Sequence, residues 1–154
     1  MRDKRFIAEH RGGPLTKAHH RQLIKWAREC AEHVLPVFGK PIDERITHAL
    51  LVAQEWEKGN ATVGEARKAS VELIAVANES INPAAIFVAR AVGHAAATAH
   101  MADHSLGAAN YALKAIKAAG KLIEEERAWQ DAQLPAEIKE LVLSARKNRP
   151  GLIK

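Results

Sequence analysis

Four residues near position 100 are of the types that hold metal ions: His94, His100, Asp103 and His104. Imidazole nitrogens together with a carboxylate oxygen are common ligands of zinc, iron and nickel. Residues four apart share one face of a helix, whereas residues six apart point about 120° away from each other. His100 and His104 could therefore act together, and His94 would join them only through a bend in the chain. One hypothesis is a transition-metal site, in a metal-binding or metal-dependent protein.

The same residues also fit a purely structural role. Asp103 or Ser105 can cap the helix that follows, and His100 and His104 can hydrogen-bond to nearby carbonyl groups. Two histidines four apart, without the glutamate of recognised metal motifs, are more typical of this role. The sequence therefore predicts no bound cofactor, and a transition metal is the alternative.

Other patterns of catalytic residues are missing from the sequence. It has no phosphate-binding glycine loop, no G-x-S-x-G motif and no C-x-x-C pair. The single cysteine, Cys30, precedes His33 by three positions. Together with neighbouring apolar residues it falls on the apolar face of a predicted helix. A thiol in such a position usually behaves as a small buried hydrophobe. We therefore predict no catalytic residues and a protein that is not an enzyme.

A basic stripe is the second feature that could contact a partner. It consists of Lys17, Arg21, Lys25 and Arg28, which recur every four or three positions. A stripe of this kind suits an acidic protein surface or phosphate, so a helical scaffold with a nucleic-acid-associating face is another alternative. Scattered solvated charges explain the pattern better, and no interleaved aromatic residues favour nucleic acid.

Two single residues complete the candidates for partner binding. Arg11 lies beside two glycines near the N-terminus, and Trp129 has the most polar neighbourhood of the three tryptophans. Arginine and tryptophan are enriched among the residues that dominate protein interfaces. Packing within the domain is the competing interpretation of Trp129.

Composition and charge limit the kind of protein that carries these residues. A chain of 154 residues is the size of one domain. Its net charge of +5 is uneven, because residues 1–40 carry nine Lys/Arg against four Asp/Glu, whereas residues 41–104 carry five against eight. No apolar stretch approaches the roughly 20 residues of a membrane span, and no secretory segment follows the charged start. With a single cysteine as well, we expect a soluble cytoplasmic protein with no membrane partner.

Helix-start signals divide the chain into about six helices. Residues 1–15 end in Arg-Gly-Gly-Pro-Leu and are expected to form an irregular N-terminal arm. Typical N-terminal residues of helices follow at Thr16, at Thr62 with Glu65, and at Asn82 with Pro83.

The most apolar of these helices is expected to lie at the centre of the fold. It should run from residue 83 to about residue 103, and the helix after it should bend or break near Gly120. Because the connections are short, residues 16–150 are predicted to form a single all-α domain, a compact bundle of stacked antiparallel hairpins.

Three stretches of the sequence carry a family resemblance. The first is DKRFI at 3–7 with HRGGPL at 10–15, the second is WA at 26–27 with CAEHVLP at 30–36, and the third is GHAAATAH at 93–100 with DH at 103–104. In these stretches, which span nearly the whole chain, the protein resembles bacterial immunity proteins of the kind called Imm-5-like. The resemblance implies a small, cytoplasmic, all-α protein that binds and neutralises a cognate protein toxin without catalysis. It assigns no role to the histidines or to the Arg-Gly-Gly arm.

The distribution of charge bears on the kind of toxin that would be bound. Inhibitors of nuclease toxins are often acidic mimics of nucleic acid, whereas this chain is basic at both ends. An acidic toxin surface would suit those ends. The acidic stretch within residues 41–104 could instead dock a basic toxin.

Overall fold

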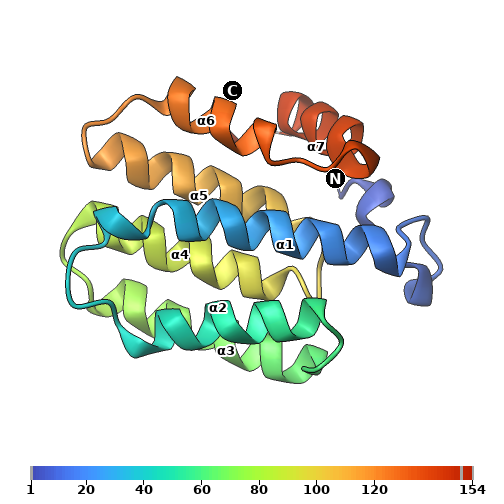
Figure 1. Cartoon of the computed structure of the whole chain (residues 1–154), viewed down its shortest axis with the longest axis horizontal. Coiled ribbons are helices and arrows are strands. Elements are labelled where there is room, and N and C mark those ends of the chain that lie inside the picture. The colour runs from blue at the N-terminus through green and yellow to red at the C-terminus, as the bar shows by residue number, and fades with distance from the viewer. Residues whose placement is uncertain (1, 150, 154) are drawn as a thin grey trace.

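The computed structural model describes residues 2–149 and 151–153, and these residues are all-α, as predicted (Figure 1). The helices are α1 Lys17–His33, α2 Glu44–Glu57, α3 Val63–Glu79, α4 Pro83–Ala97, α5 His104–Ala118, α6 Ile123–Ala132 and α7 Ala136–Asn148. Three short 3₁₀ turns accompany them: η1 Lys4–Phe6, η2 Glu9–Arg11 and η3 Leu35–Val37. No helix in this part of the chain is both long and apolar enough to cross a membrane.

The predicted helix starts are confirmed by side-chain caps. The Thr16 hydroxyl accepts a hydrogen bond from the backbone of His19 at 3.2 Å. Thr62 and Glu65 form a complete capping box, in which each side chain accepts from the other residue's backbone N–H at 3.0 Å. The Asn82 side chain caps α4 in the same way. Each cap satisfies a backbone donor that has no partner within its helix.

Two helix ends differ from the simplest expectation. The predicted break near Gly120 is complete, so α5 and α6 are separate helices and the described residues hold seven α-helices rather than six. The prediction that the central helix runs to about residue 103 was wrong, because α4 ends at Ala97. A ring nitrogen of His20, on α1, lies 2.6 Å from the Thr98 carbonyl oxygen and donates to it, so a side chain takes a carbonyl that a continuing helix would use.

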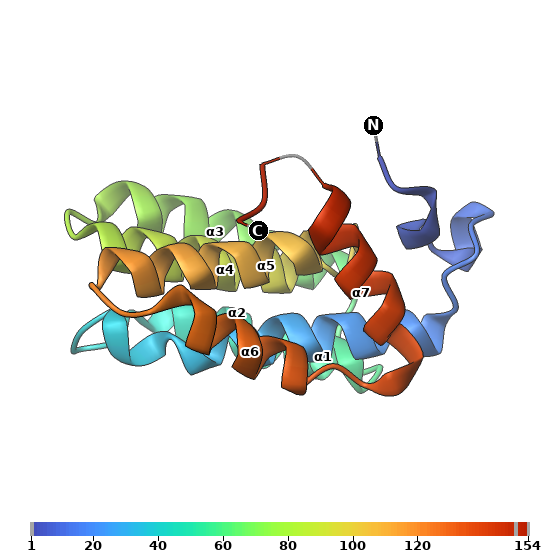
Figure 2. The same ribbon diagram turned by 90° about the horizontal axis from the view of Figure 1, so that it is seen from above.

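Helix α4 lies at the centre of the fold. It packs against α1, α2, α3 and α5, which run roughly parallel or antiparallel to it (Figures 1 and 2). Alanine dominates its buried positions, and such short side chains let neighbouring helices approach closely. Helices α6 and α7 lie on the α1–α5 side, away from α3 (Figure 1). Among the residues that the structure describes, one face of the α3–α4 pair therefore has no helix covering it.

The N-terminal arm folds back onto the helices. Ala8, between the η1 and η2 turns, forms a bridge with Leu15 at the end of the arm. Phe6 and Leu15 are buried in a core cluster that also contains Trp26. The apolar residues of the arm thus belong to the core, whereas Arg11 is exposed.

Candidate functional site

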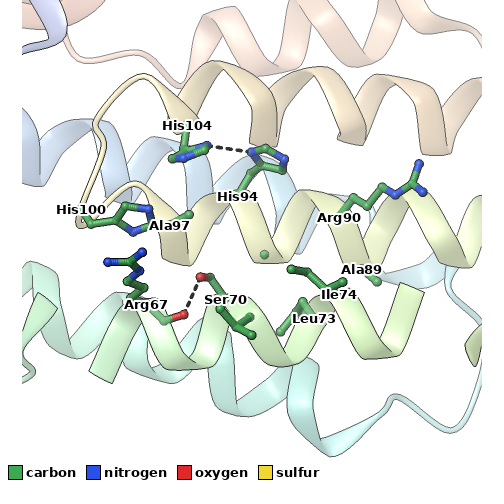
Figure 3. A pocket seen from close by; sticks show the side chains of 12 residues that line it. Arg67, Ser70, Leu73, Ile74, Ala89, Arg90, His94, Ala97, His100 and His104 are labelled. Atoms are coloured by element: carbon green, nitrogen blue, oxygen red, sulfur yellow. Dashed lines mark hydrogen bonds between the residues drawn. The ribbon is translucent and has the colours of Figure 1, made fainter. Parts of the chain in front are cut away.

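The turn between α4 and α5 brings three of the predicted histidines together. His94 lies in the last turn of α4, His104 begins α5, and His100 lies in the turn between them. The Nδ1 atoms of His94 and His104 are 3.1 Å apart, and the ring centres of His100 and His104 are 5.3 Å apart (Figure 3). The chain bend that His94 needs to join the others is therefore present, because the helix ends at Ala97.

These imidazoles are held in their neutral form. Burial is the main cause that lowers the pKa of His94 to about 4, and the neighbouring His104, Arg149 and Arg90 lower it further. Burial also lowers the pKa of His100 and of His104. At 3.1 Å, one of the facing Nδ1 atoms carries a hydrogen and donates it to the other. At neutral pH the cluster therefore offers N–H donors and nitrogen acceptors rather than positive charge.

Asp103, the fourth predicted residue, is bound elsewhere. Its buried carboxylate accepts a hydrogen bond from Arg149 at 3.4 Å and lies 3.9 Å from the Arg2 guanidinium. Among residues 2–149 and 151–153, no group of three or more His, Cys, Asp or Glu side chains is placed to hold a metal ion. The metal site stays a prediction, which elemental analysis of the purified chain would test.

The histidines line one end of a cavity of about 320 Å³ between α3 and α4 (Figure 3). We call this cavity the α3–α4 groove. It is lined by Arg67, Ser70, Val71, Leu73 and Ile74 from α3, by Ala89, Arg90, Gly93, His94 and Ala97 from α4, and by His100 and His104. No carboxylate is among these lining residues.

Two glycines let the walls of the groove come close together. A Cβ atom on Gly93 would lie 3.1 Å from the Leu73 Cβ and 3.5 Å from the Ser70 carbonyl oxygen. A Cβ atom on Gly107, in α5, would lie 2.7 Å from Nδ1 of His94. Gly93 therefore permits the contact between α3 and α4, and Gly107 leaves room for the His94 ring.

The rim of the groove combines apolar and cationic side chains. Val71 and Ile74 are 56% and 59% exposed, which is unusual for residues of their type. Arg67 and Arg90 are also exposed, and neither makes an ion pair with another described residue. Neither these arginines nor this exposed apolar surface was among the site residues predicted from the sequence.

An aromatic cluster extends the groove along α4 and α5. The Tyr111 ring centre lies 5.0 Å from that of His94 and 6.2 Å from that of Phe87. The Arg90 guanidinium lies 5.9 Å from the centres of both the Phe87 and the Tyr111 rings. The π-electrons of the rings hold the cation in place without neutralising it, so Arg90 keeps a full charge for a ligand.

The predicted basic stripe lies on α1, and we call its four residues the α1 stripe. Lys17 and Lys25 are exposed, whereas Arg21 and Arg28 are partly buried. Arg28 forms ion pairs with Glu32 at 2.5 Å and with Glu57 at 3.3 Å. One of the four cations is thus already neutralised by carboxylates of this chain.

The remaining candidates have structural surroundings of their own. Trp129 stacks on His33 with ring centres 3.5 Å apart and ring planes 6° apart. His33 in turn contacts the Glu126 carboxylate at 2.6 Å. Cys30 is fully buried, and burial raises the pKa of its thiol well above the usual value, so the thiolate is not formed near neutral pH.

A comparison with known protein families gives one result. A family model described as Imm-5 like putative immunity protein matches residues 13–137, which include α1 to α6 and the whole α3–α4 groove. Neither the curated proteins nor the solved structures gave a match.

Proposed function

This chain belongs to the Imm-5 like putative immunity protein family, and from that premise we propose that it binds and neutralises a cognate protein toxin without catalysing a reaction. The observation that carries the proposal is the family match over residues 13–137, most of the chain. In this proposal the protein acts in the cytoplasm of a bacterium and occludes a functional surface of the toxin.

The exposed face of the α3–α4 pair supports a binding role. Apolar side chains at the rim, an adjacent tyrosine and two arginines that form no ion pair with another described residue occur together there. Interfaces are enriched in arginine and aromatic residues at their energetic centres, and an apolar centre with a polar rim is their usual composition. A soluble protein rarely keeps such a surface without a partner.

Capture and co-expression test the proposed function. The tagged full chain is first used to capture partners from its native host, and the captured protein is then expressed in a test bacterium. We expect that protein to arrest growth alone and to lose this effect when the full chain is co-expressed. No complex and continued growth arrest during co-expression would contradict the proposal.

The non-catalytic part of the proposal has its own test. Occlusion requires one copy of this protein for each toxin molecule, so inhibition of the purified toxin should rise in proportion to the amount added and be complete near equimolar amounts. Complete inactivation of a large molar excess of toxin would mean that the protein acts as a catalyst.

A further inference from the structure

We propose that the α3–α4 groove is the surface that holds the toxin, and that its occupant is an acidic side chain of the toxin flanked by apolar residues. The carboxylate would lie at the end of the groove formed by Arg67 and His100, Arg90 at the opposite end would add a longer-range attraction, and the apolar neighbours would cover Val71 and Ile74. This inference rests on the proposed function, because it names the surface and the partner chemistry through which neutralisation would occur.

The charge of the groove is the first argument. Arg67 and Arg90 stand on α3 and α4, at opposite ends of the groove, with no acidic residue in its lining (Figure 3). Arg5, by comparison, is exposed and forms an ion pair with Asp3 at 2.7 Å. Two guanidinium groups without a counterion, beside a concave surface, attract a negative group.

The hydrogen-bonding groups of the groove are the second argument. Nδ1 of His100 is buried and has no hydrogen-bond partner among the described residues. In Figure 3 this ring lies beside the Arg67 guanidinium. A buried nitrogen without a partner is costly, and a neutral imidazole can place its hydrogen on either nitrogen. A carboxylate at this end of the groove would accept hydrogen bonds from His100 and Arg67 together.

The apolar rim is the third argument, and it favours a protein segment over a nucleic acid. Val71 and Ile74 are both more than half exposed and stand next to the arginines in the groove lining. Burying their side chains would contribute to binding in proportion to the apolar area covered. A nucleic acid needs a row of cations that follows its phosphates, and the groove provides two, separated by apolar residues.

The chemistry of the groove can be tested without the toxin. Butanoate, a carboxylate with a short apolar chain, is titrated into the full chain, and butylammonium of the same length serves as the cationic control. We expect butanoate, but not butylammonium, to shift the NMR signals of the His94, His100 and His104 rings in a saturable manner. Arg67→Glu/Arg90→Glu should weaken this binding by at least about tenfold. Equal responses to both probes, or none to butanoate, would overturn the inference.

Neutralisation then tests the toxin as the occupant. Arg67→Glu/Arg90→Glu is compared with Lys139→Glu/Lys147→Glu, which makes the same change of charge at exposed positions of α7. We expect the groove variant to lose at least about tenfold in protection during co-expression, and the α7 variant to stay within about twofold of wild type. The dispersion of NMR signals verifies that both variants are folded.

The outcomes separate this inference from the proposed function. If wild type protects and the groove variant protects equally well, the inference is wrong and the function stands. If wild type itself fails to protect, the function is wrong, and the assignment of a toxin carboxylate to the groove falls with it. If the groove variant instead loses binding to mixed-sequence RNA while its protection is unchanged, the occupant is a nucleic acid and the inference is overturned.

Discussion

Arg28 of the α1 stripe and the two arginines of the α3–α4 groove are all cationic, but they differ in their acidic neighbours. On α1, Arg28 is paired with Glu32 from its own helix and Glu57 from α2. In the groove, Arg67 and Arg90 face apolar side chains and neutral imidazoles. The spacing of basic residues is therefore a poor guide to where a protein binds an anion. What matters is whether the fold has already supplied a counterion.

The largest effect should come from separating the two helices that form the groove. Gly93→Val places methyl groups where a Cβ atom alone would lie 3.1 Å from Leu73, so α3 and α4 must move apart. We expect a loss of about 3 kcal/mol in the free energy of unfolding, measured with urea.

Gly64, which lies on α3, provides the matched control. Around Gly64 the nearest atom to an added Cβ is 3.8 Å away, which is an ordinary contact. Gly64→Val should therefore change stability by less than about 0.5 kcal/mol. Equal losses for both variants would show that the close approach at Gly93 does not hold the groove together.

The next effect is a dependence of stability on pH that the groove histidines produce. The pKa of His94 is about 4 in the folded protein, below its ordinary value, so between pH 6.5 and 4 the unfolded chain binds a proton that the folded chain does not. Stability is therefore highest above pH 6.5 and should fall by about 2 kcal/mol as the pH is lowered to 5. His104 from α5, Arg90 from α4 and Arg149 after α7 oppose the added charge, and Asp103 favours it.

Replacing His94 measures how much of the pH dependence of stability this one side chain causes. His94→Gln removes the titrating group, so urea unfolding at a series of pH values should give a shallower decline for the variant than for wild type. Identical slopes would mean that His94 is not buried as a neutral ring.

The smallest predicted effect is the difference in stability between removing Arg28, which is paired with carboxylates, and removing Arg67, which is not. Arg28→Ala breaks two ion pairs around a largely buried side chain and should cost about 1 kcal/mol. Arg67→Ala breaks no ion pair among the described residues and should change stability by less than about 0.5 kcal/mol. If urea unfolding reversed this order, the distinction between the two surfaces would fail.

Helix starts were predictable from sequence because the interactions that cause them are local. Thr16, the Thr62–Glu65 pair and Asn82 each bond to backbone N–H groups two or three residues away. The end of α4 was not predictable in this way. It coincides with a hydrogen bond from His20 to Thr98, two residues 78 positions apart, which only the packing of α1 on α4 brings together.

Only part of the groove could be predicted from the sequence, because packing brings its residues together from separate helices. His94, His100 and His104 stood out by residue type, but Arg67 and Arg90 look like ordinary surface arginines on two separate helices. The available signal was Gly93, a helix-breaking residue type in the middle of a strongly apolar helix. Such a glycine indicates a close helix contact, and hence which neighbouring side chains share a surface.

The dissociation constant of the purified toxin complex, measured by isothermal titration calorimetry, tests the central claim most directly. It is compared among wild type, Arg67→Glu/Arg90→Glu in the groove and Lys17→Glu/Lys25→Glu in the α1 stripe. We predict an increase of about 100-fold for the groove variant and about threefold for the stripe variant, which loses only long-range attraction. A groove variant that binds like wild type, or a stripe variant that binds more weakly than the groove variant, would contradict the account.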